Sequence, residues 1–116
     1  MAHTYQLGSI VNVDLGEPPY EVQGHEQGYE RPCVIIKLFP ELKLAVVVPC
    51  TSQEPRYSHY TIVKILQGSG GLAKDSYVLC HQIRTISFDR VIKIIGTLDV
   101  KNMLKVRAVL LDTLDL

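Results

Sequence analysis

Three polar segments interrupt the apolar stretches of this sequence and carry the groups best suited to chemistry. They span residues 24–32, 49–53 and 81–86. The first and third contain His25 and His81, and an imidazole with an unperturbed pKa of about 6.5 can transfer protons at neutral pH. The planar fork of an arginine such as Arg31 can hold two phosphate oxygens. These residue types suit acid-base chemistry beside a bound phosphate.

Neither the histidines nor the glycines form a motif for a metal or a phosphate loop. The sequence has four histidines, His3, His25, His59 and His81. They stand without the paired cysteine or carboxylate spacing of metal ligands, so we expect no metal and no cofactor. Residues 68–71 are rich in glycine but lack the lysine and the strand-to-helix setting of a phosphate-binding loop, which indicates a plain connection.

Three cysteines, Cys33, Cys50 and Cys80, each adjoin an apolar run. An odd number of cysteines without metal-ligand spacing predicts buried, reduced thiols in a cytoplasmic protein. A nucleophilic role is not indicated, because Cys33 and Cys50 abut expected strands and not the start of a helix.

Length and composition predict one folded domain over residues 1–116. The chain has a mass of 13.0 kDa, with 47% hydrophobic and 21% charged residues and a mean hydropathy of +0.13. The longest apolar stretch, residues 44–48, is far shorter than the roughly 20 residues that a membrane span needs, so neither a span nor a signal peptide is expected. Twelve basic and twelve acidic residues exclude a protein that coats nucleic acid through bulk positive charge.

Short strands must position the polar segments. Alternating or β-branched apolar runs predict strands at residues 10–15, 33–38, 44–48, 61–66, 76–80, 83–86 and 91–95. Pro32 is expected to open the second strand and Pro49 to stop the third. The long loop expected between Gly16 and Glu30 is a candidate site element.

The end of the chain has a different periodicity. Val100, Leu104 and Leu111 recur at helical spacing behind Asp99, a favourable N-cap, so a helix is predicted from Val100 to about Leu114. The elements together predict a mainly antiparallel sheet or barrel, strongly bent, with a C-terminal helix that covers part of it.

At this point the sequence resembles the MazF/PemK/Kid family of toxin endoribonucleases. The resemblance starts at Gly8-Ser9-Ile10-Val11 and continues to Ile95-Gly96-Thr97-Leu98. Between them, in the family's order, come Gly-His-Glu-Gln at 24–27 with Arg31-Pro32, Val-Pro-Cys-Thr-Ser at 48–52, and Gln-Ile-Arg-Thr-Ile at 82–86.

The resemblance implies an SH3-like antiparallel barrel of the CcdB/MazF type that forms a homodimer. It also implies metal-independent cleavage of single-stranded RNA and neutralisation by a cognate antitoxin that is acidic and partly disordered. These are expectations from the family and not from residue periodicity.

The resemblance also implies roles for individual residues. Arg31 matches the catalytic arginine and Thr51 the threonine that donates to the same phosphate, while His25 stands where the family carries Ser or His. A second group is implied in holding the loop or contacting RNA: Glu26, Gln27, Ser52, Gln53, Gln82 and Arg84. In the Kid/PemK branch an Arg-x-Asp pair precedes the glutamine, whereas this chain has Leu79 and His81, so His81 is a candidate base in place of the carboxylate.

Two other functions stay open. One is a non-catalytic poison of the same fold, like the CcdB proteins that bind DNA gyrase. The aromatic residue near the C-terminus of those proteins is missing here, where the chain ends Leu114-Asp115-Leu116. The other is an RNA-binding but inactive relative, which the departures at Leu79 and His81 allow.

Overall fold

Antiparallel strands and a C-terminal helix make up the parts of the chain that the computed structural model describes, residues 5–16, 29–56 and 60–116. The strands are β1 (Ser9–Asp14), β2 (Glu30–Phe39), β3 (Leu44–Thr51), β4 (Ile62–Ile65), β5 (Ser76–Leu79), β6 (Arg84–Ser87) and β7 (Val91–Thr97). Helix α1 spans Val100–Thr113, and short 3-10 turns are η1 (Pro40–Leu42), η2 (Ser69–Gly71), η3 (Cys80–Gln82) and η4 (Phe88–Arg90).

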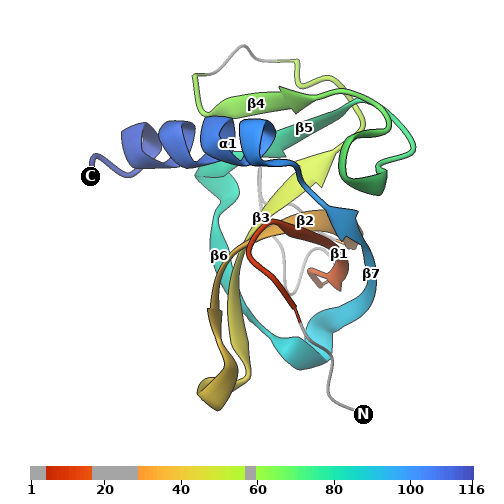
Figure 1. Cartoon of the computed structure of the whole chain (residues 1–116), viewed down its shortest axis with the longest axis vertical. Coiled ribbons are helices and arrows are strands. Elements are labelled where there is room, and N and C mark those ends of the chain that lie inside the picture. The colour runs from red at the N-terminus through yellow and green to blue at the C-terminus, as the bar shows by residue number, and fades with distance from the viewer. Residues whose placement is uncertain (1–4, 17–28, 57–59) are drawn as a thin grey trace.

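The strands form one bent sheet in the order β4-β5-β3-β2-β1-β7, with β6 paired to β3 (Figure 1). All strand pairs are antiparallel. Among the described residues no pair joins β4 to β7, so the sheet curves without closing. This confirms the predicted fold class, a mainly antiparallel sheet with a C-terminal helix.

Strand β2 runs through the middle of the sheet and is covered on both faces. Val34 packs into a core beneath α1, whereas Cys33 and Ile35 pack into a second core inside the bend of the sheet. Successive side chains of a strand point to opposite faces, so an apolar run fits a strand buried on both sides. The helix core also takes Val48, Val78, Val106 and Leu110, and the bend core takes Val11, Val13, Val47 and Ile86.

Two strand ends differ from the sequence-based expectation. Strand β2 begins at Glu30, before Pro32, because β1 pairs with it as far as the partners Asp14 and Glu30. Strand β3 continues through Pro49 to Thr51. On one side of β3 the pairing with β6 ends at Val47, and the pairing with β5 begins at Cys50. Pro49 lies between these two pairings, where a residue without an N–H group is accommodated.

A backbone turn at Tyr29 starts β2. Tyr29 has a left-handed φ of 59°, an uncommon conformation for a non-glycine residue. Its N–H donates to the carbonyl oxygen of Gly16 at 2.7 Å, and its own carbonyl accepts from the N–H of Leu15 at 2.8 Å. These two bonds hold the start of β2 against the end of β1. The remainder of the loop expected between Gly16 and Glu30, residues 17–28, lies outside the described residues.

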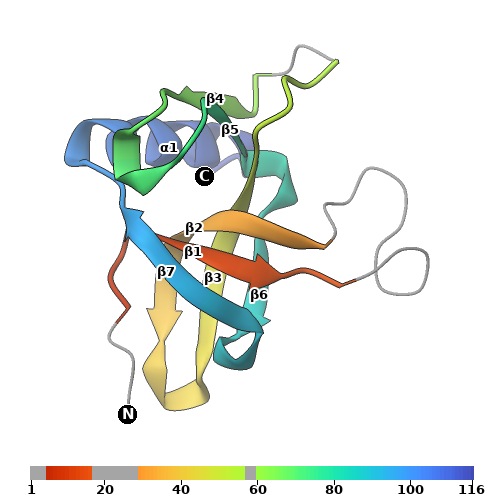
Figure 2. The ribbon, with the colours of Figure 1, turned by 90° about the vertical axis from the view of Figure 1, so that its right-hand side faces the viewer.

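Helix α1 begins as predicted at its cap, since the Asp99 side chain accepts a hydrogen bond from the N–H of Asn102 at 3.3 Å. The hydrogen bonds from Asn102 lower the pKa of Asp99. The helix lies along β4 and β5 at one end of the molecule, while the β2–β3 hairpin points to the other end (Figures 1 and 2). Within the described ranges no helix has the length and apolar character to span a membrane.

Candidate active site

A polar cavity of about 350 Å³ lies where β2 and β3 cease to pair with each other. The pairing of these strands ends at Cys33 and Pro49. Before Cys33, β2 pairs with β1 alone, and after Pro49, β3 pairs with β5. Figure 2 shows the two strands diverging. The cavity is lined by Glu30, Arg31, Pro32, Cys50, Thr51, Ser52, Gln53 and Ser76. Residues that are far apart in the sequence therefore line one cavity, because β2 and β3 diverge there and each pairs with a different strand.

Arg31 supplies the positive charge in the cavity lining. It lies on β2 opposite Val13 of β1, and its Nη1 donates to the carbonyl oxygen of Glu30 at 3.3 Å. Its Nε is buried and has no hydrogen-bond partner among the described residues. A buried donor without a partner is costly, so this guanidinium is held with unused donor capacity in a site large enough for a phosphate group.

Thr51 ends β3 and brings a hydroxyl group to the cavity. Its Oγ1 accepts a hydrogen bond from the N–H of Gln53 at 3.2 Å, and its backbone pairs with Tyr77 of β5. A hydroxyl that accepts in this way still has its own hydrogen to donate. Thr51 can therefore donate to an anion that the Arg31 guanidinium also binds.

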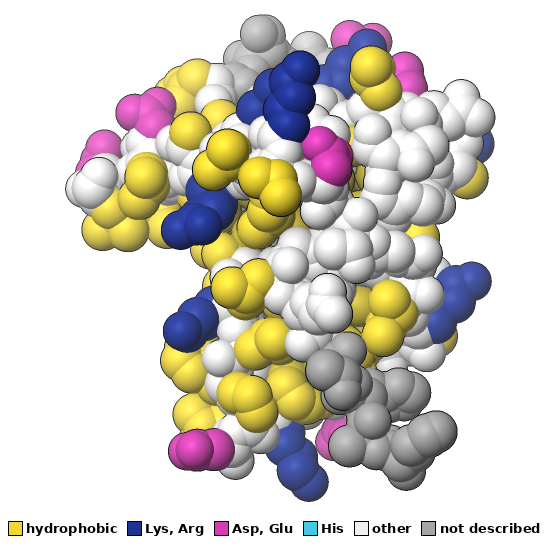
Figure 3. Space-filling view, in the orientation of Figure 1, with side chains coloured by type: hydrophobic (Ala, Val, Ile, Leu, Met, Phe, Trp, Pro, Cys, Tyr) yellow, Lys and Arg dark blue, Asp and Glu magenta, His cyan; other side chains and the backbone are white. Residues whose placement is uncertain are grey.

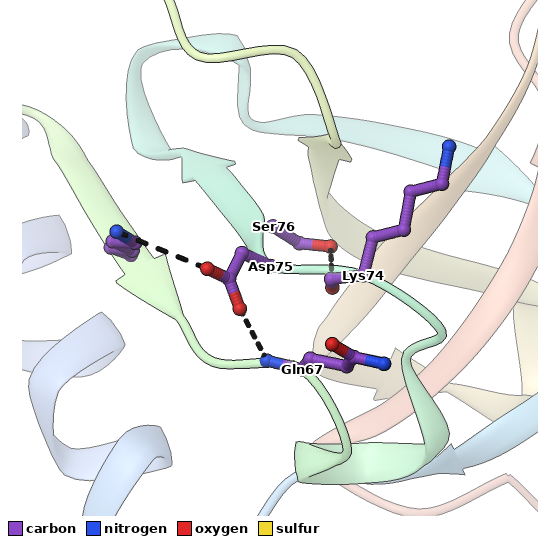
Figure 4. Close-up of polar contacts among 5 residues, drawn as sticks. Gln67, Lys74, Asp75 and Ser76 are labelled. Atoms are coloured by element: carbon purple, nitrogen blue, oxygen red, sulfur yellow. Dashed lines mark hydrogen bonds and ion pairs between the residues drawn. The ribbon is translucent and has the colours of Figure 1, made fainter.

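Hydrogen bonds in the connection between β4 and β5 stabilise the part of the cavity lining that contains Ser76. Asp75 accepts a hydrogen bond from the N–H of Gln67 at 2.8 Å and lies 4.0 Å from Nζ of Lys64. The hydroxyl of Ser76 donates to the carbonyl oxygen of Lys74 at 3.1 Å (Figure 4). These bonds fix the start of β5 and so the side of the cavity beside Thr51.

Comparison with protein families decides what kind of protein presents this cavity. A family model described as PemK-like, MazF-like toxin of type II toxin–antitoxin system matches residues 6–114. The chain belongs to this PemK/MazF-like toxin family. No curated protein sequence matches it.

Solved structures of the family share the fold. MazF from Deinococcus radiodurans is 19% identical with a TM-score of 0.80, over 99% of this chain and 100% of that one. An endoribonuclease in complex with its cognate antitoxin, from a mycobacterial species, is 22% identical with a TM-score of 0.74, over 97% of both chains. The Mycobacterium tuberculosis toxin MazF-mt6 is 21% identical with a TM-score of 0.71, over 93% of this chain and 97% of that one.

Four residues expected from the resemblance to MazF-like toxins meet in the cavity: Arg31, Thr51, Ser52 and Gln53. Three others, His25, Glu26 and Gln27, lie outside the described residues, so their expected roles stay predictions.

His81 does not line the cavity. It lies in η3, half-buried, and its Nδ1 is 2.7 Å from the hydroxyl oxygen of the buried Thr61. Thr51 pairs with Tyr77, and β5 then runs back along β3 away from Thr51, so His81 is carried four residues past that pair. The structure thus places His81 in the supporting framework, and its expected role in proton transfer stays a prediction.

Gln82 and Arg84 also belong to the framework beside β3 and do not line the cavity. Arg84 pairs with Val47 in the backbone register, and its Nη1 donates to the carbonyl oxygen of Leu15 at 3.4 Å. This bond ties β6 to the end of β1, the same end that holds Tyr29. An RNA contact for either residue stays a prediction.

Glu30 and Ser76 line the cavity although the sequence singled out neither as a site residue; Glu30 was included only as the end of the loop expected as a site element. Glu30 stands directly before Arg31 in the first polar segment, but the expected loop placed it outside any strand. It lines the cavity, and its Oε1 accepts a hydrogen bond from Nδ2 of Asn12 at 3.2 Å. The extended pairing of β1 with β2 is the signal that would have found it.

The thiols and possible metal ligands complete the account of the site. Cys33, Cys50 and Cys80 are free and buried, as predicted. Burial raises the pKa of Cys33, the pKa of Cys50 to about 12 and the pKa of Cys80 to about 11. Cys50 in the cavity wall therefore stays a neutral thiol at pH 7 and is a poor nucleophile. Among the described residues no three His, Cys, Asp or Glu side chains are grouped to hold a metal ion.

Proposed function

We propose that this chain is an endoribonuclease toxin that cuts single-stranded RNA by attack of a ribose 2′-hydroxyl on the adjacent phosphate, leaving a 2′,3′-cyclic phosphate. The observation that carries the proposal is the meeting of Arg31 and Thr51 in one polar cavity. Membership of a toxin family and the fold shared with proteins named as endoribonucleases support it.

In this proposal Arg31 and Thr51 bind the scissile phosphate. As the 2′-oxygen attacks, negative charge grows on the non-bridging oxygens of the phosphorane. The terminal N–H groups of the Arg31 guanidinium and the Thr51 hydroxyl stabilise that charge more than they stabilise the starting diester. Because the nucleophile belongs to the RNA, the reaction requires proton transfer and charge stabilisation and proceeds without a metal ion.

A cognate antitoxin and a second copy of the chain are the protein partners in the proposal, which places the toxin in the cytoplasm. One solved relative is named as an endoribonuclease in complex with its cognate antitoxin. Exposed apolar side chains on the edge strand β7 and on α1 favour a contact between two copies: Ile92, Ile94, Val100, Leu104 and Leu111. Figure 3 shows hydrophobic side chains at the surface of α1 and of the strands below it.

The proposal is tested by incubating the purified protein with single-stranded RNA in EDTA. We expect cleavage by the wild type, and a loss of at least a hundredfold in Arg31→Ala. Lys105→Ala, which removes an exposed positive charge from another face of α1, serves as the control and should cleave at the wild-type rate. RNA binding without cleavage would identify an inactive relative, and neither binding nor cleavage would favour a poison of the gyrase-binding kind.

A further inference from the structure

We propose that Glu30 is the general base that takes the proton from the ribose 2′-hydroxyl. The assignment rests on the proposed RNA cleavage and names a proton acceptor for it among the described residues. Arg31 and Thr51 can hold the phosphate, but a guanidinium cannot be deprotonated in a protein and a threonine hydroxyl is a donor here.

Among the described residues that line the cavity, Glu30 is the one with a carboxylate side chain. The other seven lining residues are an arginine, a proline, a glutamine, a buried thiol and three hydroxyl-bearing side chains. None of these is a proton acceptor at neutral pH. The carboxylate that the Kid/PemK branch carries after β5 is replaced by His81, which lies in η3 with its Nδ1 beside Thr61. Within the described residues Glu30 is thus the acceptor placed at the site.

The surroundings of Glu30 hold its side chain for this task. Asn12 donates to Oε1 at 3.2 Å, which leaves Oε2 to accept the proton of the 2′-hydroxyl. Nη1 of Arg31 donates to the backbone carbonyl of Glu30 at 3.3 Å, so the guanidinium is held close to the backbone of Glu30. Adjacent residues of a strand point to opposite sides, and both Glu30 and Arg31 border the cavity, which lies at the start of β2.

Proton transfer to Glu30 accompanies bond formation and bond cleavage at phosphorus. The Glu30 carboxylate takes the 2′-hydroxyl proton, the 2′-oxygen forms a bond to phosphorus, and the bond from phosphorus to the 5′-oxygen breaks. The leaving 5′-oxygen takes a proton from water, and the hydroxide that remains recovers the proton from the Glu30 carboxylic acid. The products are a 2′,3′-cyclic phosphate and a 5′-hydroxyl, with no net consumption of protons.

Glu30→Gln tests the assignment, because glutamine keeps the oxygen that accepts from Asn12 and loses only the ability to take a proton. We expect kcat to fall by about 10² to 10⁴ with little change in KM. The matched control is Asp14→Asn, which removes one negative charge from the backbone partner of Glu30, outside the cavity. It keeps the oxygen that accepts the N–H of Gly16, and it should retain kcat within about threefold of wild type.

A substrate with sulfur in place of the bridging 5′-oxygen separates a base from an acid. A thiolate leaves without a proton, so loss of a general acid is repaired by this substrate and loss of a general base is not. We expect the same loss in Glu30→Gln on both substrates. A Glu30→Gln enzyme as fast as wild type, or one restored by the sulfur substrate, would overturn the assignment while leaving the proposed function standing. A wild type that does not cleave RNA would overturn the proposed function itself.

Discussion

Replacing Arg31 by methionine is expected to remove RNA cleavage while leaving the folded protein slightly more stable. The methionine side chain keeps the apolar stem of the arginine and removes a buried Nε that has no partner among the described residues. Leaving such a group unsatisfied costs about 1–3 kcal/mol, and the bond from Nη1 to the Glu30 carbonyl is worth at most about 1 kcal/mol. The free energy of unfolding should therefore rise by about 1 kcal/mol, which raises Tm by about 4 °C in a chain of this size.

Cleavage should move in the opposite direction. Loss of one donor to a developing oxyanion costs about 10² to 10³ in kcat, or about 2.7–4 kcal/mol. Thermal unfolding and cleavage of a labelled single-stranded RNA are measured on the same preparation, with Lys105→Met as the control for loss of an exposed charge. Cleavage within about threefold of wild type would refute the phosphate-binding role. A fall in Tm of several degrees would refute the inference that the guanidinium is held at a cost to stability.

Three further results are expected. His81→Ala should cleave RNA within about threefold of the wild-type rate, and it should lose about 1 kcal/mol of stability with its bond to Thr61. If His81 is the base, the cleavage rate should instead fall by about a hundredfold in His81→Ala and by less in His81→Asp. Burial raises the pKa of Cys50 from 9.0 to about 12 and that of Cys80 to about 11. Because the folded protein holds these two protons more tightly than the unfolded chain does, their contribution to the free energy of unfolding is fully present below pH 9.0. This contribution should be lost as pH rises toward those values, by about 1 kcal/mol per thiol at pH 10, in urea unfolding measured at pH 8 and pH 10. Light scattering should give twice the 13.0 kDa chain mass, and a mass of one chain at micromolar concentration would contradict the dimer.

The sequence predicted the elements better than their ends. Alternation identified β1, and Asp99 identified the start of α1, because both signals are local. Pro32 and Pro49 were expected to bound their strands, yet both lie within strands. Their positions are tolerated because of which neighbour each strand pairs with at that residue, and this is a tertiary property that a single segment does not encode.

The candidate site was likewise predictable only in those residues that belong to local motifs. The family motifs indicated Arg31 and Thr51, which lie in one cavity. Glu30 escaped notice because its place depends on the pairing of β1 with β2 and on the divergence of β2 from β3. His81 is a candidate by its position in a motif; it lies in η3 and does not line the cavity, and its expected role in proton transfer stays a prediction.

A single 2′-deoxy substitution in an RNA substrate tests the central claim most directly. The cleavage position in an all-ribose oligonucleotide is mapped first, in EDTA, and the nucleotide on its 5′ side is then made without its 2′-hydroxyl. The account predicts that the all-ribose substrate is cut to a 2′,3′-cyclic phosphate and that the substituted substrate is not cut at that position. Unchanged cleavage of the substituted substrate would contradict attack by the 2′-hydroxyl, and with it the roles assigned to Arg31, Thr51 and Glu30.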